Sequence, residues 1–129
     1  MAHNIPAELK YTKDHEWTKI DGDTVVIGIT DFAQSALGDI VFVELPEVGK
    51  TLNAHQAFGV VESIKSVSDL YSPISGTVVE VNSALPDAPE LCNAEPYGSA
   101  WMIKVKLSNT QEVNSLLSAT DYQNYLSTL

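Results

Sequence analysis

Apolar and polar residues alternate over several segments with the two-residue period of half-buried β-strands. Residues 9–18 alternate weakly, a turn follows at Gly22, and the β-branched run 24–29 comes next, so these segments predict an antiparallel hairpin. Two more apolar runs, 39–45 and 101–107, predict further strands. The chain is therefore expected to be mainly β.

Short stretches between the strands have helical spacing instead. Residues 30–37 place four apolar side chains on one helical face. Thr30 is positioned to cap the N-terminus of this helix, and Gly38 is positioned to end it in the left-handed conformation. The proline-rich segment 84–96 has room for one short helix, near residues 89–93.

The C-terminal residues, from about 110 to 129, predict two more helices. Asn109 and Glu112 form a variant of the capping box for the first helix, and Ser118 and Asp121 form a cap for the second. The second helix has an amphipathic docking face at i, i+3, i+4 and i+7 spacing, formed by Tyr122, Tyr125, Leu126 and Leu129. These residues are interpreted as structural.

One lysine separates two β-branched runs in residues 59–70, which predicts a hairpin with Lys65 at its tip. The neighbouring residues Ser63, Ser66 and Ser68 are small and leave the lysine unshielded. An exposed amine on a hairpin tip is accessible to an enzyme that would acylate it. The alternative is that Lys65 only adds a solubilising charge.

A weak internal repeat surrounds this hairpin. Residues 46–52 and 73–79 share the form Pro-x-x-Gly-x-x-aliphatic, and Lys65 lies close to midway between them. Two similar half-units packed as one sandwich would place their junction, and so the lysine, at a protruding end. Coincidence is the alternative, because proline and glycine are common in turns.

The charge of the chain narrows the classes of partner. The 129 residues are expected to form one domain, 1–129, with a formal net charge of −10 from seven lysines, no arginine and seventeen acids. Without arginine the chain lacks the usual bidentate contact to phosphate, so nucleic acid and anionic membranes are not expected partners. The acidic surface suits basic patches on partner proteins, or serves only solubility.

The compartment is expected to be the cytoplasm. The chain has a single cysteine, Cys92, which excludes an intramolecular disulfide and fits a reducing environment. No apolar run approaches the length of a membrane span, and the N-terminus lacks the features of a signal or transit peptide.

The sequence contains no recognisable catalytic centre. Cys92 lies in the proline-rich segment and is expected to be buried and inert. The three histidines, His3, His15 and His55, have no metal-ligand spacing, so no metal is expected. No phosphate-binding loop or nucleophile elbow is present. The chain is therefore not expected to be an enzyme, and an attached prosthetic group would supply any chemistry.

The lysine hairpin resembles a known family. Residues 61–69 (VESIKSVSD) and 72–82 (SPISGTVVEVN) are similar to the lipoyl-lysine region of the H protein of the glycine cleavage system. Further similar motifs occur in order along the chain, at 15–17 (HEW), 28–34 (GITDFAQ), 37–46 (LGDIVFVELP) and 93–97 (NAEPY), followed by Trp101. The resemblance therefore covers nearly the whole chain.

The resemblance implies a barrel-sandwich hybrid of the lipoyl/biotinyl-carrier type, with short peripheral and C-terminal helices. It implies lipoate on Lys65 as an amide and a shuttle function. The implied partners are the pyridoxal-phosphate (PLP) glycine decarboxylase, which loads an aminomethyl group, the tetrahydrofolate-dependent aminomethyltransferase, and the FAD-containing dihydrolipoyl dehydrogenase. A lipoate ligase or a lipoyl/octanoyl transferase would attach the group. A monomer is expected, since it suits a mobile shuttle.

The resemblance also implies a surface cleft that holds the loaded arm. Glu16 and Asp69 correspond to carboxylates near that cleft and would accompany a cationic amine. The alternative is that both are solvated acids in turns. Some family members have histidine at the positions of Phe32 and Ala36, and many have glycine at the position of Ala100, so the cleft is expected to differ in detail.

Three alternatives remain open on the sequence. A biotin carrier or a lipoyl domain of a 2-oxoacid dehydrogenase would also place a lysine on a hairpin tip. However, the residues flanking Lys65 are Ile64 and Ser66, rather than the methionines typical of biotin acceptors or the preceding aspartate typical of dehydrogenase domains. A lipoyl donor of the H-protein type would use the same lysine. A hydrolase would have to use Cys92.

Overall fold

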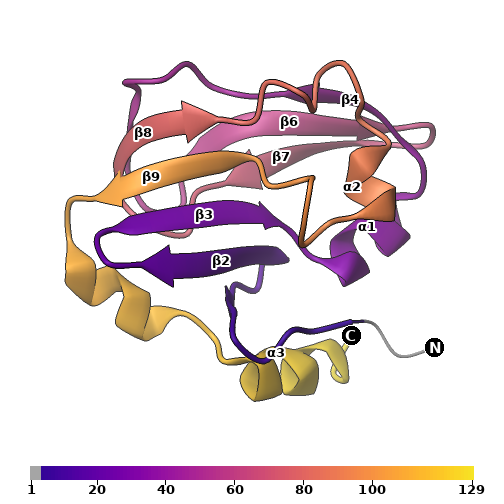
Figure 1. Ribbon diagram of the computed structural model, residues 1–129. Coiled ribbons are helices and arrows are strands. Elements are labelled where there is room, and N and C mark those ends of the chain that lie inside the picture. The colour runs from indigo at the N-terminus through magenta and orange to yellow at the C-terminus, as the bar shows by residue number, and fades with distance from the viewer. Residues whose placement is uncertain (1–3) are drawn as a thin grey trace.

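The computed structural model describes residues 4–129, which form two antiparallel sheets with short helices at the periphery (Figure 1). The mainly β prediction is confirmed. The larger sheet has the order β1(Lys10–Tyr11), β2(Glu16–Asp21), β3(Thr24–Ile29), β9(Ile103–Leu107), β8(Gly76–Val81) and β5(Thr51–Leu52). The smaller sheet has the order β4(Ile40–Glu44), β6(Ala57–Ser63) and β7(Val67–Tyr71). The helices are α1(Asp31–Leu37), α2(Leu91–Ala94), α3(Ala119–Leu126) and the 3₁₀ helix η1(Thr110–Ser115).

The main hydrophobic core contains buried side chains from both sheets. Ile27 and Val105 contribute from the larger sheet, and Val43, Val61 and Leu70 contribute from the smaller one. Each of these positions has at least one exposed or half-buried neighbour, as the two-residue period predicts, although β3 is buried on both faces from Ile27 onward. Burial of these apolar side chains is the main term that stabilises the sandwich.

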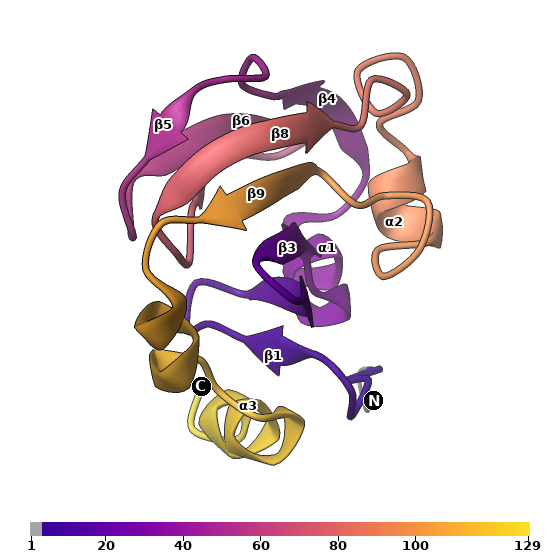
Figure 2. The same cartoon turned by 60° about the vertical axis from the view of Figure 1, so that its left-hand side comes forward.

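A second, mostly aromatic cluster attaches the C-terminal helix to the edge of the larger sheet (Figure 2). The rings of Tyr11 in β1 and Tyr122 in α3 are stacked, with centroids 4.8 Å apart and an interplanar angle of 5°. The predicted docking face is confirmed for Tyr122, which is fully buried. The prediction that Leu129 belongs to this face is wrong, because α3 ends at Leu126 and the Leu129 side chain is 66% exposed.

The N-terminal hairpin forms as predicted around Gly22, whose φ is +64° and which lies between the paired residues Asp21 and Thr24. The preceding segment is not one strand, however. Residues 12–15 turn the chain back on itself, with His15 at φ +68°, so that β1 pairs with β2. The Thr12 hydroxyl stabilises this turn by accepting hydrogen bonds from the backbone N–H groups of Asp14 (3.2 Å) and Glu16 (3.3 Å).

Helix α1 begins and ends at the predicted residues. The Thr30 side chain accepts a hydrogen bond from Ala33 N at 3.2 Å, as an N-cap should. Gly38 ends the helix at φ +85° and ψ −159°, a conformation with positive φ but outside the left-handed helical region that we expected. Helix α2, at Leu91–Ala94, lies close to its predicted position.

The first of the two C-terminal helices differs from its prediction. It is a 3₁₀ helix, and the side chain of Glu112 does not complete a capping box. The Glu112 carboxylate instead accepts hydrogen bonds from Ser75 N at 2.6 Å and Ser75 Oγ at 2.9 Å. A tertiary contact therefore takes the side chain that would have stabilised an α-helical start. The second cap is confirmed, since Ser118 Oγ accepts from Asp121 N at 3.1 Å.

The two copies of the Pro-x-x-Gly repeat lie against each other. Strand β5 from the first copy pairs with β8 from the second, with Thr51 opposite Thr77 and Leu52 opposite Gly76. Gly76 is required here, because a Cβ at this position would lie 2.1 Å from the carbonyl oxygen of Lys106. None of the helices in residues 4–129 is long and apolar enough to cross a membrane.

Candidate functional site

The β6–β7 hairpin projects from the smaller sheet beside α1 and α2, with Lys65 in its turn (Figure 1). Ser63 organises this turn. Its backbone N–H donates to Ser66 O at 2.8 Å, and its hydroxyl accepts from the N–H groups of Lys65 (3.3 Å) and Ser66 (3.1 Å). The Lys65 side chain is exposed. The predicted hairpin tip is therefore confirmed, with a hydrogen-bonded backbone and a solvent-accessible amine.

The turn after α1 is hydrogen-bonded to the tip of the hairpin. Ile64 N donates to Asp39 O at 3.1 Å, which joins the hairpin tip to the start of β4. Asn93 in α2 holds this turn, because its side-chain amide donates to Gly38 O at 2.9 Å and accepts from Ile40 N at 2.8 Å. The stem of Lys65 passes close to Gly38, since a Cβ built at that glycine would lie 3.5 Å from Lys65 Cε, which is an ordinary van der Waals contact.

Glu16 occupies a different environment at the other end of β7. Its side chain is only 2% exposed. One carboxylate oxygen accepts from Thr12 Oγ1 at 2.7 Å, and the other accepts from the backbone N–H of Tyr71 at 3.3 Å. Burial raises the pKa of this carboxyl to about 8. The alternative interpretation of Glu16 as a solvated turn acid is therefore wrong.

Asp69 lies on β7 between these two sites and is exposed. It lies four residues after Lys65 and is the third residue of the strand that follows the turn. Its side chain is on the same face of the strand as that of Tyr71, two residues later. The three residues are therefore not gathered around one point: Lys65 lies in the turn before β7, Asp69 lies on β7, and Glu16, in β2, accepts from the last residue of β7.

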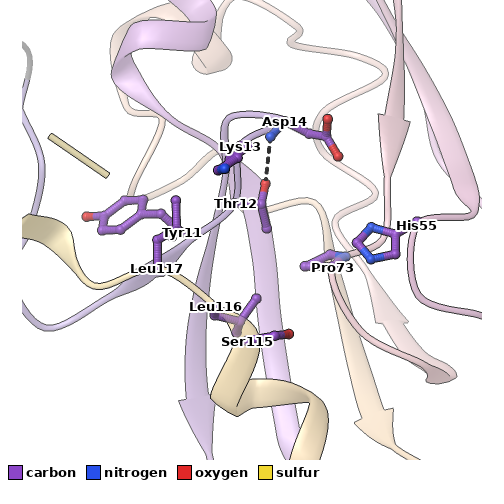
Figure 3. A pocket seen from close by; sticks show the side chains of 9 residues that line it. All are labelled: Tyr11, Thr12, Lys13, Asp14, His55, Pro73, Ser115, Leu116 and Leu117. Carbon is purple, nitrogen blue, oxygen red and sulfur yellow. Dashed lines mark hydrogen bonds between the residues drawn. The ribbon is translucent and has the colours of Figure 1, made fainter. Parts of the chain in front are cut away.

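A cavity of about 240 Å³ has Thr12, a hydrogen-bond partner of Glu16, in its lining (Figure 3). It is lined by residues of the β1–β2 turn, by His55 and Pro73, and by the end of η1 with the residues that follow it. Thr12 belongs both to this lining and to the hydrogen bonds of Glu16. No local pattern indicates that Thr12, His55 and Pro73 line one cavity, because the β1–β2 turn lies more than forty positions from the other two residues.

His15, next to Glu16, is held by the C-terminal helix. Its Nδ1 lies 2.9 Å from the hydroxyl of Tyr122, which also lies 2.8 Å from Thr30 Oγ1. Burial lowers the pKa of the imidazole. The ring of Phe32 packs against it at 4.6 Å between centroids. Phe32 is thus a packing partner of His15.

Cys92 is fully buried, and burial raises the pKa of its thiol to about 11, so the thiolate is not available at neutral pH. The prediction that this cysteine is buried is confirmed. Within residues 4–129, no three histidine, cysteine, aspartate or glutamate side chains are arranged to hold a metal ion. His3 lies outside the described residues.

Comparisons with known proteins agree over nearly the full length. A family model described as Glycine cleavage H-protein matches residues 9–129. The glycine cleavage system H protein of Geobacillus kaustophilus is 61% identical over 120 residues, covering 93% of this chain and 94% of the relative. That of Carboxydothermus hydrogenoformans is 57% identical over 122 residues, covering 95% and 94%.

The crystal structure of a glycine cleavage system H protein from Mycobacterium marinum matches this fold with a TM-score of 0.88 at 46% identity, covering 95% of this chain and 99% of that chain. The barrel-sandwich fold implied by the resemblance is thereby confirmed. A biotin carrier and a dehydrogenase lipoyl domain do not account for a family match of this extent. The chain belongs to the glycine cleavage H-protein family, whose members are the lipoyl shuttles of the glycine cleavage system.

Proposed function

We propose that this chain carries lipoate as an amide on Lys65 and takes part in glycine cleavage as a single carrier domain, residues 1–129. The observation that carries the proposal is an exposed lysine on a hydrogen-bonded hairpin turn, within a chain of this family. The carrier is not itself an enzyme, and the dithiolane of the attached group supplies the chemistry of aminomethyl transfer when it is present.

Attachment needs an activated lipoyl donor, either an acyl-adenylate or a thioester. The deprotonated Nζ of Lys65 attacks the acyl carbonyl carbon, the amide bond forms, and AMP or a thiol leaves while solvent or the enzyme takes the proton. The product loses one positive charge, which takes the formal net charge from −10 to −11. The surroundings of Lys65 fit this reaction, because its side chain is exposed and can reach the active site of another enzyme.

The partners would be the PLP-dependent glycine decarboxylase, the tetrahydrofolate-dependent aminomethyltransferase and the FAD-containing dihydrolipoyl dehydrogenase. A lipoate ligase or a lipoyl/octanoyl transferase would modify Lys65. The carrier works in the cytoplasm as a monomer and binds neither nucleic acid nor membrane. Its net charge of −10 supports recognition by basic surfaces on these enzymes.

Glu16 and Asp69 would receive the loaded arm. An arm attached at Lys65 and laid along β7 passes the exposed carboxylate of Asp69 first and then approaches the carboxyl of Glu16 beside Tyr71. The cationic aminomethyl amine would be attracted to Asp69. Its approach would also lower the pKa of Glu16 from about 8 and favour the ionised carboxylate, which gives the buried end of the path a counter-ion for the amine.

Intact-mass spectrometry tests the attachment. The purified chain is incubated with lipoate, ATP and a lipoate–protein ligase, and a single lipoyl mass increment is expected. Lys65→Arg should gain no mass, whereas the control Lys19→Arg, which changes another exposed lysine, should gain the same increment as the parent. An unmodified parent chain, or an equal gain in Lys65→Arg, would contradict the proposal.

A further inference from the structure

The Thr12 side chain fixes the place of the Glu16 carboxyl. Its hydroxyl donates to Glu16 Oε1 at 2.7 Å and also accepts from the backbone N–H of Glu16 at 3.3 Å. The same oxygen accepts from Asp14 N at 3.2 Å (Figure 3). The carboxyl therefore keeps its position only while the turn of residues 12–15 keeps its shape. We name Glu16 and Thr12 together the receiving site, because Glu16 ends the path that we propose for the arm.

His15 is the strained residue of this turn. Its φ of +68° lies in the left-handed region, which residues other than glycine adopt at a cost and keep only where their surroundings hold them. Within the turn, His15 N donates to Thr12 O at 3.2 Å. From outside the turn, His15 O accepts from Thr30 N at 3.0 Å, and the ring of Phe32 packs on the imidazole. The shape of the turn thus depends on contacts with other elements.

The Tyr122 hydroxyl holds the imidazole of His15. It lies 2.9 Å from His15 Nδ1 and 2.8 Å from Thr30 Oγ1. Thr30 Oγ1 already accepts from Ala33 N, so all groups are satisfied when Thr30 donates to Tyr122 and Tyr122 donates to His15 Nδ1. This direction requires a neutral imidazole with its proton on Nε2, in agreement with the lowered pKa that burial gives His15.

The ring of Tyr122 holds the other end of the same turn. It stacks on Tyr11, which directly precedes Thr12, with 4.8 Å between the ring centroids. The Tyr122 side chain is fully buried, although this residue lies 107 positions after His15 in the chain. One side chain of α3 therefore contacts the residues at both ends of the turn, Tyr11 through its ring and His15 through its hydroxyl.

We propose that Tyr122 is a positioning residue of the receiving site. By holding both ends of the turn it keeps Thr12, and through Thr12 the Glu16 carboxyl, in place for the cationic end of the loaded arm. This inference rests on the proposed function. Tyr122 acts through His15 and the turn, so loss of its hydroxyl should weaken protection of the aminomethyl group and leave attachment at Lys65 unchanged.

The first test follows the Glu16 carboxyl in the chain without lipoate. NMR of ¹³C-labelled glutamate measures its titration, and Glu16→Gln identifies its resonance. Tyr122→Phe keeps the ring stacked on Tyr11 and removes the hydroxyl from His15. The pKa of Glu16 should then fall by about one pH unit or more from about 8, because a loosened turn admits water and burial is the main cause of the raised value.

Tyr125→Phe is the matched control for this titration. It removes a hydroxyl from the same helix and keeps a ring whose centroid lies 6.0 Å from that of His15, while the bonds of Tyr122 stay in place. The Glu16 titration should match that of the parent. Both variants should gain the parent's lipoyl mass increment when incubated with lipoate, ATP and a lipoate–protein ligase.

The second test measures protection of the loaded arm. The lipoylated chain is loaded with glycine and the decarboxylase, and then separated from both. Hydrolysis of the aminomethyl group consumes one water and releases ammonia, formaldehyde and the free dithiol. Tyr122→Phe should release ammonia about threefold faster or more, because water reaches the receiving site, whereas Tyr125→Phe should match the parent.

A double-variant cycle separates positioning from a general structural role. In the Glu16→Gln background, Tyr122→Phe should add no further increase in ammonia release, because both changes act on the same carboxyl. If Tyr122 only stabilised the fold, its effect would add to that of Glu16→Gln.

A second pair of variants applies if near-UV circular dichroism shows that Tyr122→Phe is misfolded. His15→Ala and His15→Gly both remove the imidazole that Tyr122 holds, but only glycine adopts a positive φ without strain. His15→Ala should lower the pKa of Glu16 and speed ammonia release, and His15→Gly should do so much less. Equal effects of the two substitutions would overturn the proposal.

Each remaining outcome has one meaning. A parent chain that the ligase does not modify would contradict the proposed function itself. A folded Tyr122→Phe variant with the parent's Glu16 titration, or with the parent's rate of ammonia release, would overturn the positioning role and leave attachment at Lys65 standing. A Glu16→Gln variant that releases ammonia at the parent's rate would remove Glu16 from the path of the arm, and the role of Tyr122 with it.

Discussion

The two ends of β7 differ in almost every physical respect, although five strand residues separate them. At one end the amine of Lys65 is solvated and projects from a turn held by Ser63. At the other end the carboxyl of Glu16 is buried and holds two hydrogen bonds. An attachment point needs access and mobility, whereas a receiving site needs a prearranged environment that excludes water. If Lys65 is the attachment point and Glu16 belongs to the receiving site, as proposed, β7 joins the two at a fixed separation.

The largest contrast should appear in stability. Glu16→Ala should lower the free energy of unfolding by about 2–4 kcal/mol, because it leaves a buried cavity and removes the acceptor for Thr12 and Tyr71. Lys65→Ala should change it by less than about 0.5 kcal/mol, since the lysine is exposed. Urea unfolding measures both values. Equal effects of the two substitutions would contradict the contrast between the two ends.

The pH dependence of stability should isolate Glu16. Its carboxyl has a pKa of about 8 in the folded chain, against an ordinary value of 4.5 when unfolded. Between these values the folded state binds more protons, so its contribution to stability is full below pH 4.5 and is lost as the pH rises through 8. The Glu16→Gln variant has no such titration. Its free energy of unfolding relative to the parent should therefore increase between pH 5 and pH 8.5.

That difference can be followed by urea unfolding of both proteins at several pH values in one buffer series. The comparison cancels the other carboxylates, which titrate alike in parent and variant. A difference that stays constant from pH 5 to pH 8.5 would show that Glu16 titrates normally and that its end of β7 is not the low-dielectric environment described above.

The smallest effect on folding should come from Asp69, between the two ends. Asp69→Asn should leave the free energy of unfolding within about 0.5 kcal/mol of the parent, because the side chain is exposed. If the loaded arm lies along β7, the variant should release ammonia from its aminomethyl group several-fold faster. Asp21→Asn, another exposed acid, serves as the control. Equal release rates in both variants would remove Asp69 from the path of the arm.

Local patterns were enough to predict the hairpin end. The β-branched runs around Lys65, the cap at Thr30 and the turn at Gly22 depend on residues close in sequence, and each forms as expected. The Glu16 end depends on contacts that no local pattern contains. Its burial requires Tyr71, which lies 55 residues away in the chain.

Tertiary contacts also explain the other differences between sequence and structure. Glu112 bonds to Ser75 instead of capping its own helix, and the segment there is a 3₁₀ helix. The exposed Val41–Phe42 pair arises from a shift of register between β4 and β6. Alternation alone cannot place such a shift, because an extra residue in one strand becomes visible only when its partner strand is known.

Among residues 4–129, β7 pairs with β6 alone, so its other edge presents main-chain groups to its surroundings. A free strand edge of this kind is a template for pairing with another chain and for aggregation. The carboxylate of Glu16 accepts the N–H of Tyr71 on this edge, and the charge of Asp69 lies on the same strand. We expect the acidic groups that would receive the arm also to disfavour edge-to-edge association, because one occupies an edge N–H and the other adds a charge to the edge strand.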